Sequence, residues 1–165
     1  CYTGGFSVYA AAGGAKEVCS VDASERAVQL ADENMRLNFG GEYPHTTLAC
    51  DAVEYLKQIG DRYDLIILDP PAFTKSGATV ENARRGYREI NRRAMQILPR
   101  GGYLATCSCS HFMTDTLFRA MLADAARDAS VQLRQIEARQ QSPDHPILWG
   151  VPETDYLKFY LFQIV

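Results

Sequence analysis

Short runs of β-branched and apolar residues alternate along this chain with longer stretches in which apolar residues recur three and four positions apart. Strands are predicted at 17–22, 47–50, 63–68 and 103–108, and helices at 6–12, 24–39, 51–60, 80–97 and 114–129. This alternation is typical of βαβ units in a doubly wound parallel sheet. The last runs, at 131–138 and 156–165, predict an antiparallel pair at one sheet edge. The predicted class is therefore α/β, with a mostly parallel sheet and an antiparallel C-terminal edge strand.

The same patterns predict which parts of these elements are buried. The run at 63–68 is apolar, which is typical of a strand buried on both faces. In the helix at 114–129, the spacing turns five side chains inward: Leu117, Phe118, Met121, Leu122 and Ala125. His45 precedes the strand at 47–50 and is predicted to lie in a loop.

The length of 165 residues suits one domain spanning 1–165. Apolar residues make up 47% and charged residues 22%, which excludes a disordered or collagen-like chain. No apolar run reaches membrane-spanning length and no basic leader precedes one, so we expect a cytoplasmic protein. The net charge of -3 argues against nucleic acid binding by the surface as a whole, although local basic clusters can still bind.

Five cysteines, at positions 1, 19, 50, 107 and 109, are expected to be reduced thiols. They form no CxxC pair and lack the Cys/His spacing of a zinc site, so no metal is predicted. The chain opens on the glycine turn CYTGG, which in a doubly wound sheet follows a central first strand. We therefore expect that strand to lie upstream, which makes 1–165 an N-terminally truncated domain.

A candidate ligand crevice lies at the carboxyl edge of the predicted sheet. Gly4 and Gly5 open the first helix and allow a ligand to approach the backbone amides. Asp22 and Asp51 each follow a strand, where a carboxylate can accept hydrogen bonds from ribose hydroxyls. Alone, a glycine pair is often a structural turn and a strand-end aspartate is often a helix cap. Their combination at one sheet edge favours ligand binding.

The apolar strand at 63–68 runs into the segment DPPAF, whose prolines cannot continue a ladder, so 69–79 is predicted to be a loop. This loop offers the Asp69 carboxylate and the ring of Phe73, on which a base can stack. The neighbouring strand ends in TCSCS, which places Cys107 beside this turn. Cys107 and Cys109 share a face if the strand continues, whereas a turn starting at Ser108 separates them. The alternative is that a cysteine in a buried strand is an inert core residue.

Arginines at positions 84, 88 and 92 form a stripe along the helix at 80–97. Such a row is most often a solvent-exposed face, and Glu81 and Glu89 partly neutralise its positive charge here. The functional alternative is a patch that binds phosphates next to the active edge. His145 lies in the irregular segment 140–154, which is long enough to form a lid.

Four segments together resemble one known family: TGGFSVYAAAGGAKEVCSVDAS, LDPPAF, LATCSCSHF and the late PDHPILWGVPETDYLK. This is the family of S-adenosylmethionine-dependent ribosomal RNA large-subunit methyltransferases of the 5-methylcytosine class, the methyltransferase I-like family. The resemblance covers the whole chain, except that the family's N-terminal RNA-binding and linking domains and the first strand of its catalytic domain lie outside it. It implies a Rossmann-like methyltransferase fold, S-adenosyl-L-methionine as the cofactor and RNA, of ribosomal origin, as the partner. It implies no membrane, and it is compatible with a homodimer.

The resemblance also implies roles for individual residues. Gly4 and Gly5 would approach the methionine end of the cofactor, Asp22 the ribose hydroxyls, and Asp51 with Ala52 the adenine; Thr3 and Asp69 complete this cofactor-binding set. Cys107 matches the position whose thiolate adds to carbon 6 of cytosine, so that carbon 5 can take a methyl group.

Substrate contacts follow from the same resemblance. Asp69 would hold the exocyclic amine and ring nitrogen of the base. Pro70 and Phe73 would pack against a base turned out of its helix. The functional interpretation of the arginine stripe, which does not depend on the resemblance, assigns Arg88 and Arg92 to RNA phosphates. The role of Cys109, helper or bystander, is left open.

Two other functions compete with this one. A methyltransferase acting on a base nitrogen would use Asp69 and the Pro70 carbonyl to grip an amino group, and Cys107 would be incidental. A non-catalytic module would bind RNA or a partner protein on the same fold. A dehydrogenase is the least favoured, because the glycines of the dinucleotide fingerprint are absent.

Overall fold

The computed structural model describes residues 1–41, 43–60, 63–73 and 79–165, and the chain divides into two compact units, 1–58 and 59–165. Residues 74–78 of the predicted loop lie outside the described residues. Among the helices that are described, none combines the length and the apolar composition needed to cross a bilayer.

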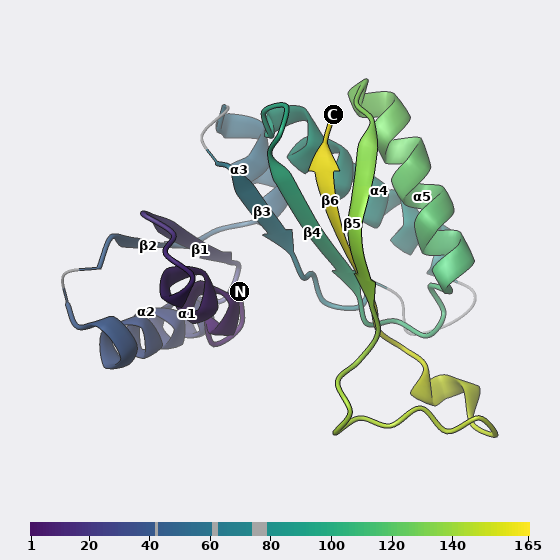
Figure 1. Cartoon of the computed structure of the whole chain (residues 1–165), viewed down its shortest axis with the longest axis horizontal. Helices are drawn as coiled ribbons and strands as arrows, with labels where there is room; N and C mark the ends of the chain where they lie inside the picture. Colours follow the sequence, from purple (N-terminus) through teal and green to yellow (C-terminus); the bar gives the residue numbers. More distant parts are fainter. Residues whose placement is uncertain (42, 61–62, 74–78) are drawn as a thin grey trace. The chain divides into compact units, whose positions relative to one another are not determined.

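The first unit contains two parallel strands, β1 (Val18–Asp22) and β2 (His45–Ala49), paired in register from Val18 and His45 to Asp22 and Ala49. Figure 1 shows its helices, which are α1 (Gly5–Ala12), α2 (Glu25–Phe39) and α3 (Ala52–Gln58). The carboxyl ends of β1 and β2 therefore lie at the same edge.

Local sequence explains where α2 begins and ends. The Ser24 side chain accepts a hydrogen bond from the Ala27 amide, which caps the first turn. Gly40, with φ of 75°, ends the helix in a conformation that L side chains rarely adopt. Three apolar residues spaced three and four apart, Val28, Ala31 and Met35, are buried on one side of the helix.

The second unit is a four-stranded sheet in the order β3-β4-β6-β5. Its elements are β3 (Leu65–Leu68), α4 (Val80–Ile97), β4 (Tyr103–Ser108), α5 (Asp115–Ala129), β5 (Leu133–Arg139), the 3₁₀ turn η2 (Pro152–Thr154) and β6 (Lys158–Ile164). Strands β3 and β4 are parallel, whereas β6 runs antiparallel to both β4 and β5.

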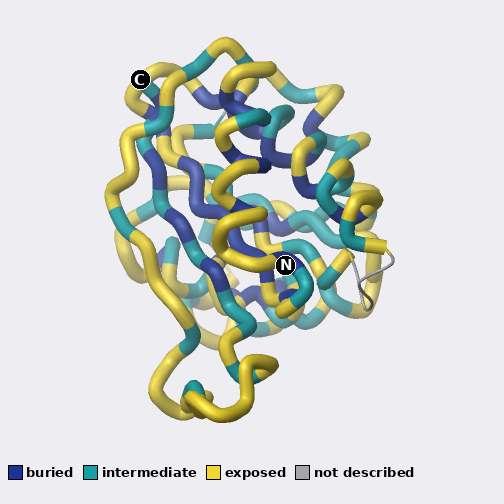
Figure 2. Tube along the Cα trace, turned by 90° about the vertical axis from the view of Figure 1, so that its right-hand side faces the viewer, coloured by how far each residue is buried: buried dark blue, intermediate teal, exposed yellow. Residues whose placement is uncertain are grey.

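Helices α4 and α5 pack together on one face of this sheet (Figure 1). Alternate residues of β6, from Lys158 to Ile164, are buried, and Tyr87, Phe118 and Met121 of the helices are fully enclosed. The segment between β5 and β6 projects from the sheet and is mostly exposed (Figure 2), and Trp149 in it is 100% exposed.

The structure confirms the α/β class, with parallel pairing of β1 with β2 and of β3 with β4, and it corrects four details. The C-terminal strand β6 lies inside the sheet, and β5 is the antiparallel edge strand. His45 is the first residue of β2, because it pairs with Val18. Leu65 is 43% exposed, so β3 is not buried on both faces, and Leu117 of α5 is 37% exposed.

Candidate active site

The predicted glycine turn opens α1, and its two glycines differ in what they require. Gly4 is buried with φ of +81°, and a Cβ built on it would lie 2.7 Å from the Ala31 Cβ and 2.8 Å from the Ala31 Cα. Only glycine fits there. Gly5 is exposed, and a Cβ at this position would meet nothing within 4 Å. The open space over Gly5 is where the backbone can be approached by a ligand.

Asp22 ends β1 and ties the glycine turn to the strand. Its Oδ2 accepts hydrogen bonds from the nitrogen of Cys1 at 2.7 Å and of Tyr2 at 3.2 Å, and its Oδ1 accepts one from the Ser24 amide at 3.0 Å. Partial burial acts to raise the pKa of Asp22, but these hydrogen bonds outweigh it and the pKa is lowered. The carboxylate is ionised at neutral pH, and Oδ1 keeps a lone pair for a ligand hydroxyl.

Asp51 follows β2 and caps α3. Its Oδ1 accepts from the amides of Val53 at 2.8 Å and Glu54 at 3.0 Å, which is the structural role that the sequence offered as the alternative. The Cys50 amide donates to the Asp22 carbonyl at 3.0 Å, so both acids lie at the carboxyl edge of the β1–β2 pair. Ala52 is the first residue of α3, and the Thr3 carbonyl accepts from Asn34 at 2.8 Å.

These features of the first unit fit a cofactor that carries a ribose and a polar chain. Asp22 has an ionised carboxylate with remaining acceptor capacity, and Asp51 is exposed at the same edge. The space over Gly5 is open to such a ligand.

In the second unit, strand register brings Asp69 next to Cys107. Leu68 of β3 is the parallel partner of Thr106 of β4, so the residues that follow each of them are neighbours. Asp69 is exposed, yet the protein around its carboxyl removes water from it, and this desolvation raises its pKa. Cys107 is 4% exposed; burial raises the pKa of its thiol to about 12, and the nearby Asp69 adds to the shift.

The two cysteines of the TCSCS segment are separated. Strand β4 ends at Ser108, so Cys107 still belongs to the sheet and is buried, whereas Cys109 lies beyond it and is exposed. The turn after Ser108 therefore decides between the two arrangements that the sequence allowed.

Phe73 offers the exposed aromatic surface that the sequence predicts. It is 39% exposed, and it packs edge-on against Tyr87 of α4 with a centroid distance of 4.6 Å. The fully buried Tyr87 hydroxyl accepts a hydrogen bond from Ser108 at 3.1 Å and also hydrogen-bonds the Phe73 backbone. Burial raises the pKa of Tyr87, so it stays a neutral phenol. Tyr87 thus joins the DPPAF turn to the end of β4.

The arginine stripe of α4 is engaged in ion pairs with acidic residues. Arg84 pairs with Asp124 at 2.8 Å and Arg88 with Asp128 at 2.6 Å, both on α5, while Arg92 pairs with Glu89 at 2.8 Å. These contacts account for the stripe within the unit. RNA contact by Arg88 and Arg92 stays a prediction.

Sequence reasoning missed two polar residues near this edge, Tyr87 and Lys158. Tyr87 is buried with the apolar positions of α4, but a buried tyrosine needs a partner for its hydroxyl, and this need is the signal for its role. Lys158 alternates in phase with the buried Tyr160, Phe162 and Ile164, and this phase is the signal that it faces inward.

Comparison with known proteins relates both units to one family. The sequence model of S-adenosylmethionine-dependent methyltransferases matches residues 1–163. Ribosomal RNA large subunit methyltransferase I of Aeromonas hydrophila is 46% identical over 162 residues, which cover 96% of this chain and 41% of that protein. The protein of the same name from Tolumonas auensis is 45% identical over 161 residues, with 96% and 41% covered. The chain thus spans about two fifths of the length of these relatives.

Among solved structures, the chain is similar to SMU.776, which was solved in complex with SAH. The TM-score is 0.83 at 24% identity, over 98% of this chain and 43% of the other. At this identity the likeness concerns the fold.

Proposed function

The chain belongs to the family of S-adenosylmethionine-dependent methyltransferases, and from that premise we propose that it methylates carbon 5 of a cytosine in ribosomal RNA through a covalent cysteine adduct. One observation carries the proposal. Asp69 and Cys107 follow paired residues of β3 and β4, and the charge of Asp69 contributes to the raised pKa of the Cys107 thiol, which supports a shared role for the two residues. The relatives named above are ribosomal RNA methyltransferases, which supports RNA as the substrate and the cytoplasm as the location.

S-adenosyl-L-methionine supplies the methyl group, which is carried on a positively charged sulfur. Gly5 leaves room for its methionine end beside the turn at Thr3 and the buried Gly4. Asp22 would accept from the ribose hydroxyls, and Asp51 with Ala52 would border the adenine. The family resemblance assigns Asp69 a part in cofactor binding as well as in binding of the base.

The chemistry needs a nucleophile because carbon 5 of cytosine reacts poorly until a group has added to carbon 6. The Cys107 proton passes to Asp69 as the sulfur bonds to carbon 6, and Asp69 passes a proton to ring nitrogen 3. The resulting enamine takes the methyl group at carbon 5. The proton on carbon 5 then leaves to a base, the carbon–sulfur bond breaks, and nitrogen 3 gives up its proton.

The base has to leave its stack to reach this edge. Phe73 packs against Tyr87 and Gly86 and is partly exposed, so a flat ring can pack on its exposed surface. Pro70, in the same turn, would add a second packing surface. Arg88 and Arg92 would contribute by exchanging their intramolecular partners for phosphates.

A second function, methylation of a base nitrogen without an adduct, is favoured by the burial of Cys107. A thiol that is 4% exposed and has a pKa of about 12 is a weak nucleophile at rest. In this alternative Asp69 and the Pro70 carbonyl hold an amino group, and Cys107 only fills the core.

Replacement of Cys107 by serine, with Cys109→Ser as the matched control, separates the two functions. The proposal predicts that Cys107→Ser abolishes turnover and that Cys109→Ser leaves it near normal. RNA carrying 5-fluorocytosine should form an adduct with the unchanged protein that survives denaturing gel electrophoresis, because fluorine blocks the final proton loss. Near-normal turnover of Cys107→Ser, with no adduct, would instead establish the nitrogen reaction.

The target can be found in cells that lack the gene. Mass spectrometry of their ribosomal RNA should show one cytosine that has lost its methyl group. A change at a base nitrogen, or no change, contradicts the proposal.

A further inference from the structure

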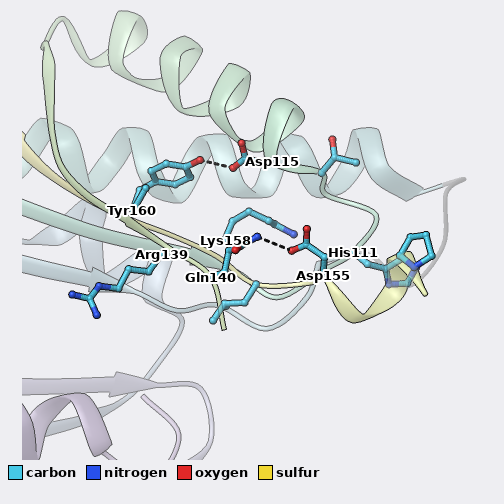
Figure 3. Close-up of a pocket in the computed structure, with 11 residues that line it drawn as sticks. His111, Asp115, Arg139, Gln140, Asp155, Lys158 and Tyr160 are labelled. Atoms are coloured by element: carbon cyan, nitrogen blue, oxygen red, sulfur yellow. Dashed lines mark hydrogen bonds between the residues drawn. The ribbon is translucent and has the colours of Figure 1, made fainter. Parts of the chain in front are cut away.

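A cavity of about 590 Å³ lies in the second unit at the edge where β4 ends (Figure 3). Its walls come from the first residues of β6 and α5, the end of β5, and the projecting segment between β5 and β6. This volume lies within the range of pockets that hold small organic ligands. The candidate active site described above does not use these residues.

Lys158 brings a buried ammonium group to this cavity. The residue is 6% exposed, and its Nζ donates to the backbone carbonyls of Ser110 at 2.6 Å and Tyr156 at 2.8 Å. An ammonium group has three N–H donors, so one is left over after these two bonds. A buried charge needs strong partners, and a ligand oxygen at the third donor would complete the set.

Asp155 supplies the complementary acceptor. It is exposed, and its Oδ1 accepts from the Gln140 side chain at 3.3 Å, which uses one of about four acceptor sites of the carboxylate. Asp115, the other acid of the lining, is already the acceptor for the Tyr160 hydroxyl. Both acids keep acceptor sites, and the charge of Asp155 acts more strongly on Lys158 than that of Asp115 does. Asp155 is therefore the carboxylate that we assign to the N–H donors of a ligand.

The charges and walls of the cavity favour a neutral, flat ligand. Lys158 and Arg139 are balanced by Asp115 and Asp155, so a phosphate would meet as many carboxylates as cations. Apolar surface for a ring comes from Pro152 and Leu157.

We propose that this cavity binds a guanine base of the RNA substrate, with its carbonyl oxygen on Lys158 and its ring N–H and amino group on Asp155. Guanine is the RNA base that presents a carbonyl acceptor next to two N–H donors on one edge, and single-stranded RNA is read on that edge. Uracil offers one such donor, and adenine and cytosine place an amino group where the ammonium needs an acceptor.

The position of the cavity indicates which guanine this is. Lys158 is the antiparallel partner of Ser108, and it holds the carbonyl of Ser110, so it lies within a few residues of Cys107. The guanine therefore flanks the target nucleotide. This assignment rests on the proposed RNA substrate, and it adds a sequence preference to it.

The test uses an RNA library in which the nucleotides on both sides of one cytosine are randomised. The RNA retained by the protein on a filter is sequenced, and the methylated RNA is sequenced separately. We expect guanine to be enriched at one flanking position by about tenfold or more. Asp155→Asn should remove the enrichment, whereas Asp144→Asn, the same charge change at an exposed position of the same segment, should keep it. Inosine at the enriched position, which lacks the amino group, should weaken binding to the unchanged protein.

Three outcomes overturn the inference: no guanine enrichment in the retained RNA, enrichment that persists in Asp155→Asn, or equal binding of guanine and inosine. If the retained RNA is enriched through Asp155 but no cytosine gains a methyl group at carbon 5, the guanine site stands and the proposed reaction fails.

Discussion

The two glycines at the start of α1 allow a sharp separation of a structural role from a ligand-binding role. In Gly4→Ala the new methyl group would lie 2.7 Å from the Ala31 Cβ, in a residue whose φ is +81°. A left-handed alanine costs roughly 1–2 kcal/mol. Relief of the clash by backbone and side-chain shifts costs about 1–3 kcal/mol more.

Alanine also reduces the conformational entropy of the unfolded chain, which raises the free energy of unfolding by about 0.4–1 kcal/mol. The free energy of unfolding should therefore fall by about 3 kcal/mol, with a range of about 1–5 kcal/mol. For a domain of this size, each kcal/mol corresponds to a shift in Tm of roughly 2–4 °C. Gly4→Ala should therefore melt on the order of 10 °C lower. Gly5→Ala has open space and no positive φ, so its free energy of unfolding should rise slightly, by about 0.4–1 kcal/mol.

For cofactor affinity we expect Gly5→Ala, the variant that keeps its stability, to show the loss. The methyl group of Gly5→Ala occupies the space assigned to the methionine end of the cofactor, so its affinity for S-adenosylhomocysteine should drop although the protein is at least as stable. Thermal unfolding with calorimetric titration measures both quantities. A Gly4→Ala protein as stable as the parent refutes the packing argument, and unchanged affinity of Gly5→Ala refutes the assignment of that space.

Four further perturbations test the remaining residues. Asp22→Ala should weaken cofactor binding by about 1–3 kcal/mol in titration calorimetry, and unchanged affinity contradicts the ribose contact. The pKa of Asp69 is raised in the folded state, so its ionisation destabilises the fold as the pH rises through that pKa. Asp69→Asn should then be inactive yet more stable than the parent at pH 7 by urea unfolding. The difference in the free energy of unfolding between the two proteins should shrink towards pH 4. A difference that does not change with pH rules out the ionisation of Asp69 as its cause. Tyr87→Phe leaves the Ser108 hydroxyl without its acceptor, so it should lower the free energy of unfolding by about 1–3 kcal/mol and lower turnover. Equal urea midpoints of variant and parent would disprove the predicted loss of stability. Arg88→Glu with Arg92→Glu should weaken RNA binding and flatten its dependence on salt, and a loss of stability alone would assign these arginines to their ion pairs with Asp128 and Glu89.

Local signals predicted the elements well where the sequence sets both ends. The helix α4 and the strand β4 have the predicted bounds, because Pro99 and the glycine pair at 101–102 separate them. The strand-end positions of Asp22, Asp51 and Asp69 were also predictable, since each acid directly follows an apolar or β-branched run.

Features that depend on pairing between distant segments were not predictable in this way. His45 belongs to a strand because Val18 is its partner, and β6 lies inside the sheet because its residues pair with both β4 and β5. The separation of Cys107 from Cys109 likewise depends on where the β4 ladder stops. Period-2 alternation marks a face of a strand, but it does not say which strand lies beside it.

The pKa shifts of Asp69 and Cys107 belong together, and this coupling bears on both candidate reactions. Each group is desolvated, and an ionised Asp69 makes ionisation of Cys107 harder, so the pair resists carrying two negative charges. A proton therefore stays on the thiol until an acceptor arrives. A bound cytosine provides such an acceptor, because Asp69 can take the thiol proton and pass it on to nitrogen 3 of the base. Methylation of an amino nitrogen needs no such proton exchange. Because the thiol of the free protein keeps its proton, alkylation of Cys107 by iodoacetamide should be slow whichever reaction the protein catalyses. Only the cytosine-5 reaction predicts that bound RNA makes Cys107 reactive towards carbon 6 while its thiol stays unreactive towards solvent reagents.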